Sequence, residues 1–133
     1  MAEKNLKTLL SSMSPHLHPG EFVFTSITES EFAALNLAPL CLFREDGRVS
    51  LIVEKYVAEQ AQLDFSGTWS QITCQIQSDL TAVGFLAEMS TVLAKAGIAV
   101  NAVSALAHDH LFVPAERSAE AMELLSVLSS STK

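Results

Sequence analysis

The feature of this sequence that most restricts its fold is an order of local signals that occurs twice. Residues 21–63 predict a strand, a helix, a hairpin and a helix, and residues 69–128 predict the same parts in the same order. The two segments share little residue identity, so the repeat is one of elements. A βαββα unit forms an antiparallel sheet with both helices on one face. The sequence therefore predicts an α+β protein built from two such units.

Two local signals fix the first unit. Thr28 and Glu31 have the spacing of a capping box, in which each side chain accepts the backbone amide of the other residue. Strands at 40–44 and 49–54 flank the pair Asp46-Gly47, which suits a type I′ turn because both central residues of that turn need positive φ. We therefore expect a helix start at Thr28 and a tight hairpin after it.

The second unit begins with a strand from Trp69 to Gln77, whose alternation predicts one buried face and one polar face. An amphipathic helix is predicted over about 82–96, followed by a hairpin with strands at 98–106 and 110–113. Pro114 then opens the last helix.

The N-terminal residues precede both repeats. Residues 4–13 predict a short amphipathic helix, and residues 14–20, which hold two histidines and two prolines, predict a loop. We therefore expect one domain over residues 1–65, which includes the N-terminal helix, and a second over residues 66–133.

Residues 77–100 resemble the signature of the ACT domain family. That signature has an acidic residue, a gap, a glycine, an apolar helix and Ala-Gly-Ile before the second strand, and here these parts are Asp79, Gly84 and residues 96–98. The gap before Gly84 is longer than the family's usual one. The hairpin residues 103–114 are similar to aspartate-kinase regulatory regions and tandem arginine-sensing proteins. The first half is similar to the degenerate first ACT unit of such proteins.

The resemblance implies two ferredoxin-like βαββα units of the ACT type and a regulatory protein that binds an amino acid or a related small metabolite in the cleft between them. Free amides at a helix start favour a carboxylate, and Gly84 lets a ligand approach them. The carboxylate of Asp109 suits an α-ammonium. The structural alternative is that Gly84 eases packing and Asp109 only makes a turn. The expected ligand-binding residues are Asp79, Val83, Gly84, Phe85, Ile98 and Asp109.

Because alanine favours helix, we expect Gly84→Ala to cost little stability.

Composition and motifs exclude several other classes of function. A formal charge of -7 with no run of Lys and Arg argues against nucleic-acid binding. No stretch of ~18 apolar residues is present to span a membrane. Neither a Gly-x-Ser-x-Gly motif nor a phosphate-binding glycine loop occurs, so we expect neither an enzyme nor a cofactor. Cys41 and Cys74 lie in apolar runs without metal-ligand spacing, which favours a reducing compartment and thus the cytoplasm.

Three further features bear on partners. His108 and His110 could form part of a metal site, but no further ligands are near in sequence, so we expect a solvated turn there, as for His16 and His18. Trp69 lies on the polar side of its strand, where it suits a subunit interface or a ligand pocket, or is simply partly buried under a loop. We expect a homodimer that acts on an unidentified target protein. The alternative function is a ligand-free dimerisation or interaction module.

Overall fold

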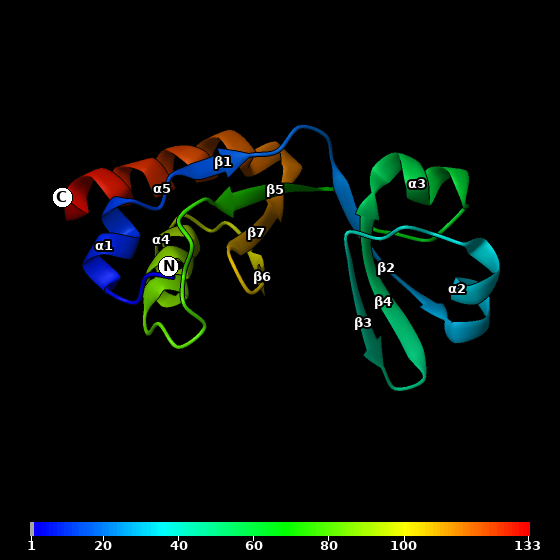
Figure 1. Cartoon of the computed structure of the whole chain (residues 1–133). Helices are drawn as coiled ribbons and strands as arrows, with labels where there is room; N and C mark the ends of the chain where they lie inside the picture. Colours follow the sequence, from blue (N-terminus) through cyan, green and yellow to red (C-terminus); the bar gives the residue numbers. More distant parts are fainter. Residues whose placement is uncertain (1) are drawn as a thin grey trace. The chain divides into compact units, whose positions relative to one another are not determined.

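A computed structural model describes residues 2–133 and divides them into two compact units (Figure 1). Unit 2 is the continuous segment Gly20–Trp69. Unit 1 combines the N-terminal segment up to Pro19 with Ser70–Lys133. Both units have antiparallel strand pairs covered by helices, so the predicted α+β class with two βαββα repeats is confirmed.

Unit 2 holds the first repeat. Its elements are β2 (Phe22–Thr28), α2 (Glu29–Leu35), β3 (Cys41–Glu45), β4 (Arg48–Glu54) and α3 (Lys55–Gln60). Strand β4 lies between β3 and β2 and is antiparallel to both. On the other side of β2, Phe22 pairs with Trp69, the last residue of the unit.

Both local signals of the first repeat are confirmed. The Glu31 amide donates to Thr28 Oγ1 at 3.1 Å, and the Thr28 amide donates to the Glu31 carboxylate at 2.9 Å. The bond from the Thr28 amide lowers the pKa of Glu31, because it favours the charged carboxylate. Asp46 and Gly47 have φ of 51° and 77°, as a type I′ turn requires. The turn pairs Glu45 with Arg48 and so fixes the hairpin register.

One face of the unit 2 sheet is packed against its helices. Alternate residues of β2 and β4 form this core with Ala58 of α3, because side chains at every second position of a strand share a face. The buried members are Val23, Ile27, Val49, Leu51, Val53 and Ala58.

Unit 1 holds the second repeat and the N-terminal segment. Its elements are α1 (Leu6–Ser11), β1 (Pro15–Leu17), β5 (Trp69–Cys74, of which Trp69 belongs to unit 2), α4 (Phe85–Lys95), β6 (Asn101–Ser104), β7 (Asp109–Pro114), the 3₁₀ turn η1 (Ala115–Arg117) and α5 (Ser118–Thr132). The strand order is β1-β5-β7-β6.

Strand β1 corrects the expectation of a loop over residues 14–20. Residues Pro15, His16 and Leu17 pair antiparallel with Cys74, Thr73 and Ile72 of β5. A strand of only three residues that begins at Pro15 has too little alternation to be predicted, and its partner lies far away in sequence. Proline is tolerated because it is the first residue of the strand.

The structure also differs from the expected domain boundary, because the N-terminal residues pack in unit 1. Leu9 and Met13 are fully buried in the core that α4 and α5 form over the sheet. The spacing of apolar residues correctly predicted an amphipathic helix near the N-terminus. That helix packs in unit 1, whereas we had expected it in the domain over residues 1–65. In Figure 1 α1 lies beside the C-terminal end of α5.

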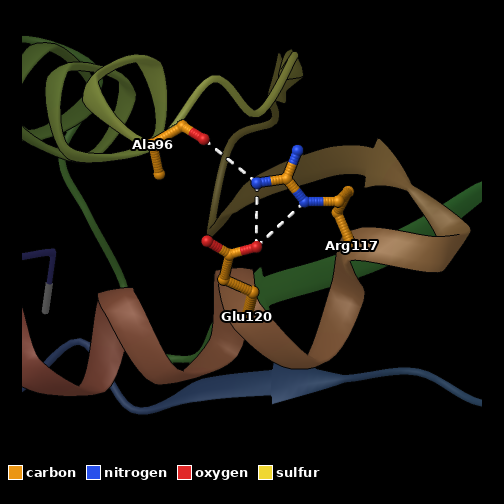
Figure 2. A network of polar contacts seen from close by, with 3 residues as sticks. All are labelled: Ala96, Arg117 and Glu120. Carbon is orange, nitrogen blue, oxygen red and sulfur yellow. Dashed lines mark hydrogen bonds and ion pairs between the residues drawn. The ribbon is translucent and has the colours of Figure 1, made fainter.

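The ends of α4 and α5 are joined by one guanidinium group (Figure 2). Arg117 donates at 3.0 Å to the carbonyl oxygen of Ala96, the C-cap of α4, and its Nε donates at 2.9 Å to Glu120. Carbonyls at a helix C-terminus have no partner within the helix and carry partial negative charge, so a cation is favourable there.

We predict that Met13→Ala destabilises unit 1 by about 2–5 kcal/mol, because truncating a fully buried methionine leaves a cavity. Urea denaturation measures the change. Lys7→Ala, at an exposed position of α1, is the matched control. Equal stability of the two variants would contradict the placement of the N-terminal segment in unit 1.

Candidate ligand site

The loop after β5 is held from two sides by backbone bonds. The Glu3 amide donates to the Gln77 carbonyl at 2.8 Å, and the Asp79 amide donates to the Glu3 carbonyl at 2.9 Å. On the other side, the Ser78 amide donates to the Ala107 carbonyl at 3.1 Å. The N-terminal residues and the β6–β7 hairpin therefore position this loop together.

A pocket of about 200 Å³ lies where this loop, the start of α4 and the β6–β7 hairpin meet. It is formed within unit 1 alone, whereas we had expected a cleft between units. Its walls combine hydroxyl groups and carboxylates with apolar side chains. The lining residues are Ser78, Asp79, Leu80, Ala82, Phe85, Leu86, Ser104, Ala105 and Asp109.

Asp109 is the buried charged group of this pocket. Its side chain is only 7% exposed, and its two carboxylate oxygens accept hydrogen bonds from Ser78 Oγ at 3.1 Å and Ser104 Oγ at 2.6 Å. A carboxylate has about four lone-pair sites, so these two bonds leave acceptor capacity for a ligand. A cationic group that entered the pocket would meet an oriented, poorly hydrated carboxylate.

The start of α4 supplies the opposite polarity. Gly84 is its N-cap, and the first helical bond runs from the Glu88 amide to the Gly84 carbonyl at 3.0 Å. The amides of residues 85–87 precede that bond and so lie outside the helical pattern. Phe85 and Leu86, which open the helix, line the pocket, so the positive end of the helix borders it.

The other predicted residues have different surroundings. The Asp79 carboxylate accepts the amide and the hydroxyl of Thr81, which lowers the pKa of Asp79 and ties it to its own turn. Val83 is 82% exposed and does not line the pocket. Ile98 is 3% exposed and packs in the unit 1 core, so it does not line the pocket either.

Sequence reasoning missed Ser78 and Ser104, the two hydroxyl donors to Asp109. Serine is common in loops and carries no spacing signal of its own. Only the pairing of the β5 end with the β6–β7 hairpin brings these side chains to the carboxylate.

The thiol nearest the pocket does not act as a nucleophile at neutral pH. Cys74 is buried in the core, and burial together with the Asp109 charge raises the pKa of its thiol to about 12. The thiolate is the reactive form of cysteine, so Cys74 behaves as a small apolar side chain. Among residues 2–133, no group of three or more His, Cys, Asp or Glu side chains could hold a metal ion.

The chain belongs to the ACT domain family. One ACT domain model matches residues 1–70, and a second ACT domain model matches residues 65–127. These two matches confirm the tandem arrangement that the second half of the sequence had indicated. A search of curated proteins gave no match.

Solved structures show the same fold. A Vibrio cholerae protein of unknown function, described as a possible transport protein, is 37% identical with a TM-score of 0.81, covering 95% of this chain and 97% of its own. A protein from Agrobacterium tumefaciens is 19% identical with a TM-score of 0.69, covering 86% and 87%. The regulatory subunit of aspartate kinase from Thermus flavus is 11% identical with a TM-score of 0.70, covering 89% and 98%.

We predict that Gly84→Ala destabilises unit 1 by about 1–3 kcal/mol, against the small cost expected from helix propensity. Gly84 stands outside the helix with φ of 98°, where an L side chain is strained, and an added Cβ would lie 3.2 Å from Leu6 Cδ2. Thermal denaturation measures the loss. Gly67→Ala is the control for strain alone, because Gly67 has φ of 74° with no atom within 4 Å of an added Cβ. A cost for Gly84→Ala no larger than that control would show that the Leu6 contact relaxes freely.

Proposed function

We propose that this chain is a regulatory protein that binds an amino acid in the unit 1 pocket. The observation that carries the proposal is the pairing of opposite charges across one small pocket. The buried Asp109 carboxylate lies on the β6–β7 hairpin, and the positive start of α4 lines the same pocket. An amino acid carries the complementary pair of charges.

The ligand's α-ammonium would bind Asp109, and its α-carboxylate would accept from amides at the start of α4. Leu80, Ala82 and Leu86 give the pocket an apolar wall against which a side chain can pack. A volume of about 200 Å³ is below the ~300–1,000 Å³ of most ligand pockets, which favours a small ligand.

Binding would regulate by favouring one conformational state over another. The pocket is lined by two stretches that are distant in sequence, residues 78–86 and 104–109, so a ligand that bridges them would stabilise unit 1. The fold shared with a regulatory subunit of aspartate kinase supports a regulatory rather than a catalytic role, and the response would act on a second protein. Both cysteines are free, which supports our proposal of a cytoplasmic protein. Within residues 2–133, none of the helices could serve as a membrane span.

A second candidate function rests on the exposed sheet face of unit 2. Phe43 is 69% exposed there, and Phe24 contacts Trp69 edge to face with ring centroids 5.5 Å apart. A hollow of about 470 Å³ crosses the same face, lined in part by Cys41 and Ile52. Aromatic groups of this kind are enriched in subunit interfaces. We therefore propose that the protein forms a homodimer, and dimerisation through this face would be its function if no ligand binds.

We predict that a thermal-shift screen of the twenty amino acids finds a stabilising ligand. At 100 times its dissociation constant, a ligand adds about 2.7 kcal/mol of stability. Asp109→Asn should weaken its binding by roughly 1.5–3 kcal/mol in calorimetry, because a charge-assisted bond is lost. Asp79→Asn is the control, since that carboxylate is bonded within its own turn, and its effect should be much smaller. If no amino acid stabilises the wild type, the dimerisation function replaces this one.

We predict that Phe43→Glu shifts the protein from dimer to the 14.3 kDa monomer, because a charge on the apolar face would be buried in the interface. Light scattering at micromolar concentration measures the mass. Tyr56→Glu, which changes a 57% exposed aromatic residue of α3, is the control and should leave the dimer intact. A wild type that is monomeric throughout this range contradicts the proposed dimer.

A further inference from the structure

The four histidines of the chain, which the sequence places in two separate pairs, come together on one side of the unit 1 sheet. Ile72 and Leu111 face the helices, so alternation turns Thr73 and His110 to the opposite side. The rings of His16 and His18 lie 4.8 Å apart, and those of His108 and His110 lie 6.4 Å apart. The expected solvated turns are instead parts of one cluster.

The two pairs are joined by one hydroxyl group. Thr73 Oγ1 lies 2.6 Å from His18 Nε2 and 2.8 Å from His110 Nδ1. Gln71 Nε2 also contacts His110 Nδ1, at 3.2 Å. Thr73 and Gln71 are 8% and 6% exposed, so this polar face of β5 is also buried, and its bonds are made within the protein.

Counting protons assigns the charge state of this network. The Gln71 amide nitrogen can only donate, so His110 Nδ1 accepts and carries no proton. The single proton of the Thr73 hydroxyl then also points to His110 Nδ1. The hydroxyl oxygen must accept from His18 Nε2–H. The network as it stands therefore requires a neutral His110.

The surroundings of the cluster also favour neutral rings. Burial lowers the pKa of His110, and charges on His108 and His18 would lower it further, while Asp109 raises it. Burial and His16 lower the pKa of His18. On the neighbouring strand β5, Cys74 faces the core on the other side of the sheet and stays neutral, and β6 contributes no ionisable group. Asp109 is thus the anion that acts on His110 from its neighbouring position in β7.

We propose that the histidine cluster binds a proton at His110 and that this site is coupled through Asp109 to the ligand pocket, so that protonation and ligand binding oppose each other. The coupling is electrostatic. His110 and Asp109 are adjacent on β7 and face opposite sides of the sheet. A proton on His110 and an ammonium group in the pocket would therefore both be stabilised by the negative charge of Asp109. This inference rests on the proposed function only for the nature of the ligand's charge.

The direction of the effect follows from linkage. A proton on His110 disfavours an ammonium group in the pocket, and a bound ammonium group disfavours the proton. Thermodynamic reciprocity requires the affinity for the proton and the affinity for the ligand to change by the same factor. The pKa of His110 lies below its ordinary 6.5, so the ring is neutral at pH 7 and becomes protonated as the pH falls below that value. The pocket would therefore bind a cationic group less tightly in acid than at neutral pH.

The link that the Thr73 hydroxyl makes between His18 and His110 is tested by NMR titration of the four histidines in the wild type and in Thr73→Val. This substitution removes the hydroxyl at nearly constant volume. Neutral His110 loses a bond that it accepts, so its pKa should rise. Protonated His18 loses an acceptor, so its pKa should fall. Opposite movements of the two midpoints support the link. Unchanged midpoints, or movements in the reverse directions, overturn it.

The coupling is tested in the same titration without any ligand. Asp109→Asn removes the negative charge, as a bound ammonium would neutralise it, and should lower the pKa of His110. Asp79→Asn, which neutralises another carboxylate of the pocket, should leave His110 unchanged and is the matched control. If Asp109→Asn does not give a dispersed amide spectrum, Asp109→Ser carries the same expectation.

A His110 midpoint that is equal in the wild type and the Asp109 variants overturns the coupling, whatever the pocket binds. A failed amino-acid screen would instead contradict the proposed function and leave these midpoints as they are. The two failures are therefore distinguishable.

Discussion

The burial of the N-terminal segment in unit 1 is the interaction on which the rest of that unit depends. Leu9, Leu10 and Met13 complete a core that α4 and α5 alone would leave open on one side. The same segment then places β1 against β5 and brings the Glu3 backbone to the loop that precedes α4. The fold of unit 1, its pocket and the histidine cluster thus all depend on the packing of the N-terminal segment.

The two units solve the same problem of an exposed strand in related ways. In each, a hairpin lies on one side of the first strand of the repeat, and a segment from outside the repeat pairs with the other side. For β5 that segment is β1, whereas for β2 it is the single residue Trp69, which pairs only with Phe22. Covering the second side of a strand satisfies backbone groups that would otherwise remain open to association.

Local features of the fold could be predicted from the sequence, because nearby residues determine them. The capping box at Thr28 and the turn at Asp46-Gly47 each depend on bonds or backbone angles within four residues. Strand β1 could not be predicted, since its three residues are defined by a partner more than fifty positions away.

The candidate site was predictable only in part, for the same reason. Of the residues that the resemblance implied, Asp79, Phe85 and Asp109 line the pocket, and their role in binding a ligand stays a prediction. Ile98 was assigned to it because it begins the segment after Gly97, yet the start of β6 at Asn101 leaves Ile98 in the core. The hydroxyls of Ser78 and Ser104, and the histidine cluster around Thr73, arise from contacts between strands that no local pattern reports.

The interrupted course of unit 1 has a consequence for how the chain reaches its native state. During synthesis from the N-terminus, Gly20–Trp69 emerges as a complete unit before the partners of α1 and β1 in Ser70–Lys133 exist. The apolar face of α1 therefore remains exposed to solvent until the last helix, α5, has been synthesised. Such surface makes an incomplete chain prone to aggregation. Early folding of unit 2 would shorten this interval, because a compact insert brings its two ends together and lowers the entropy lost when β1 finds β5.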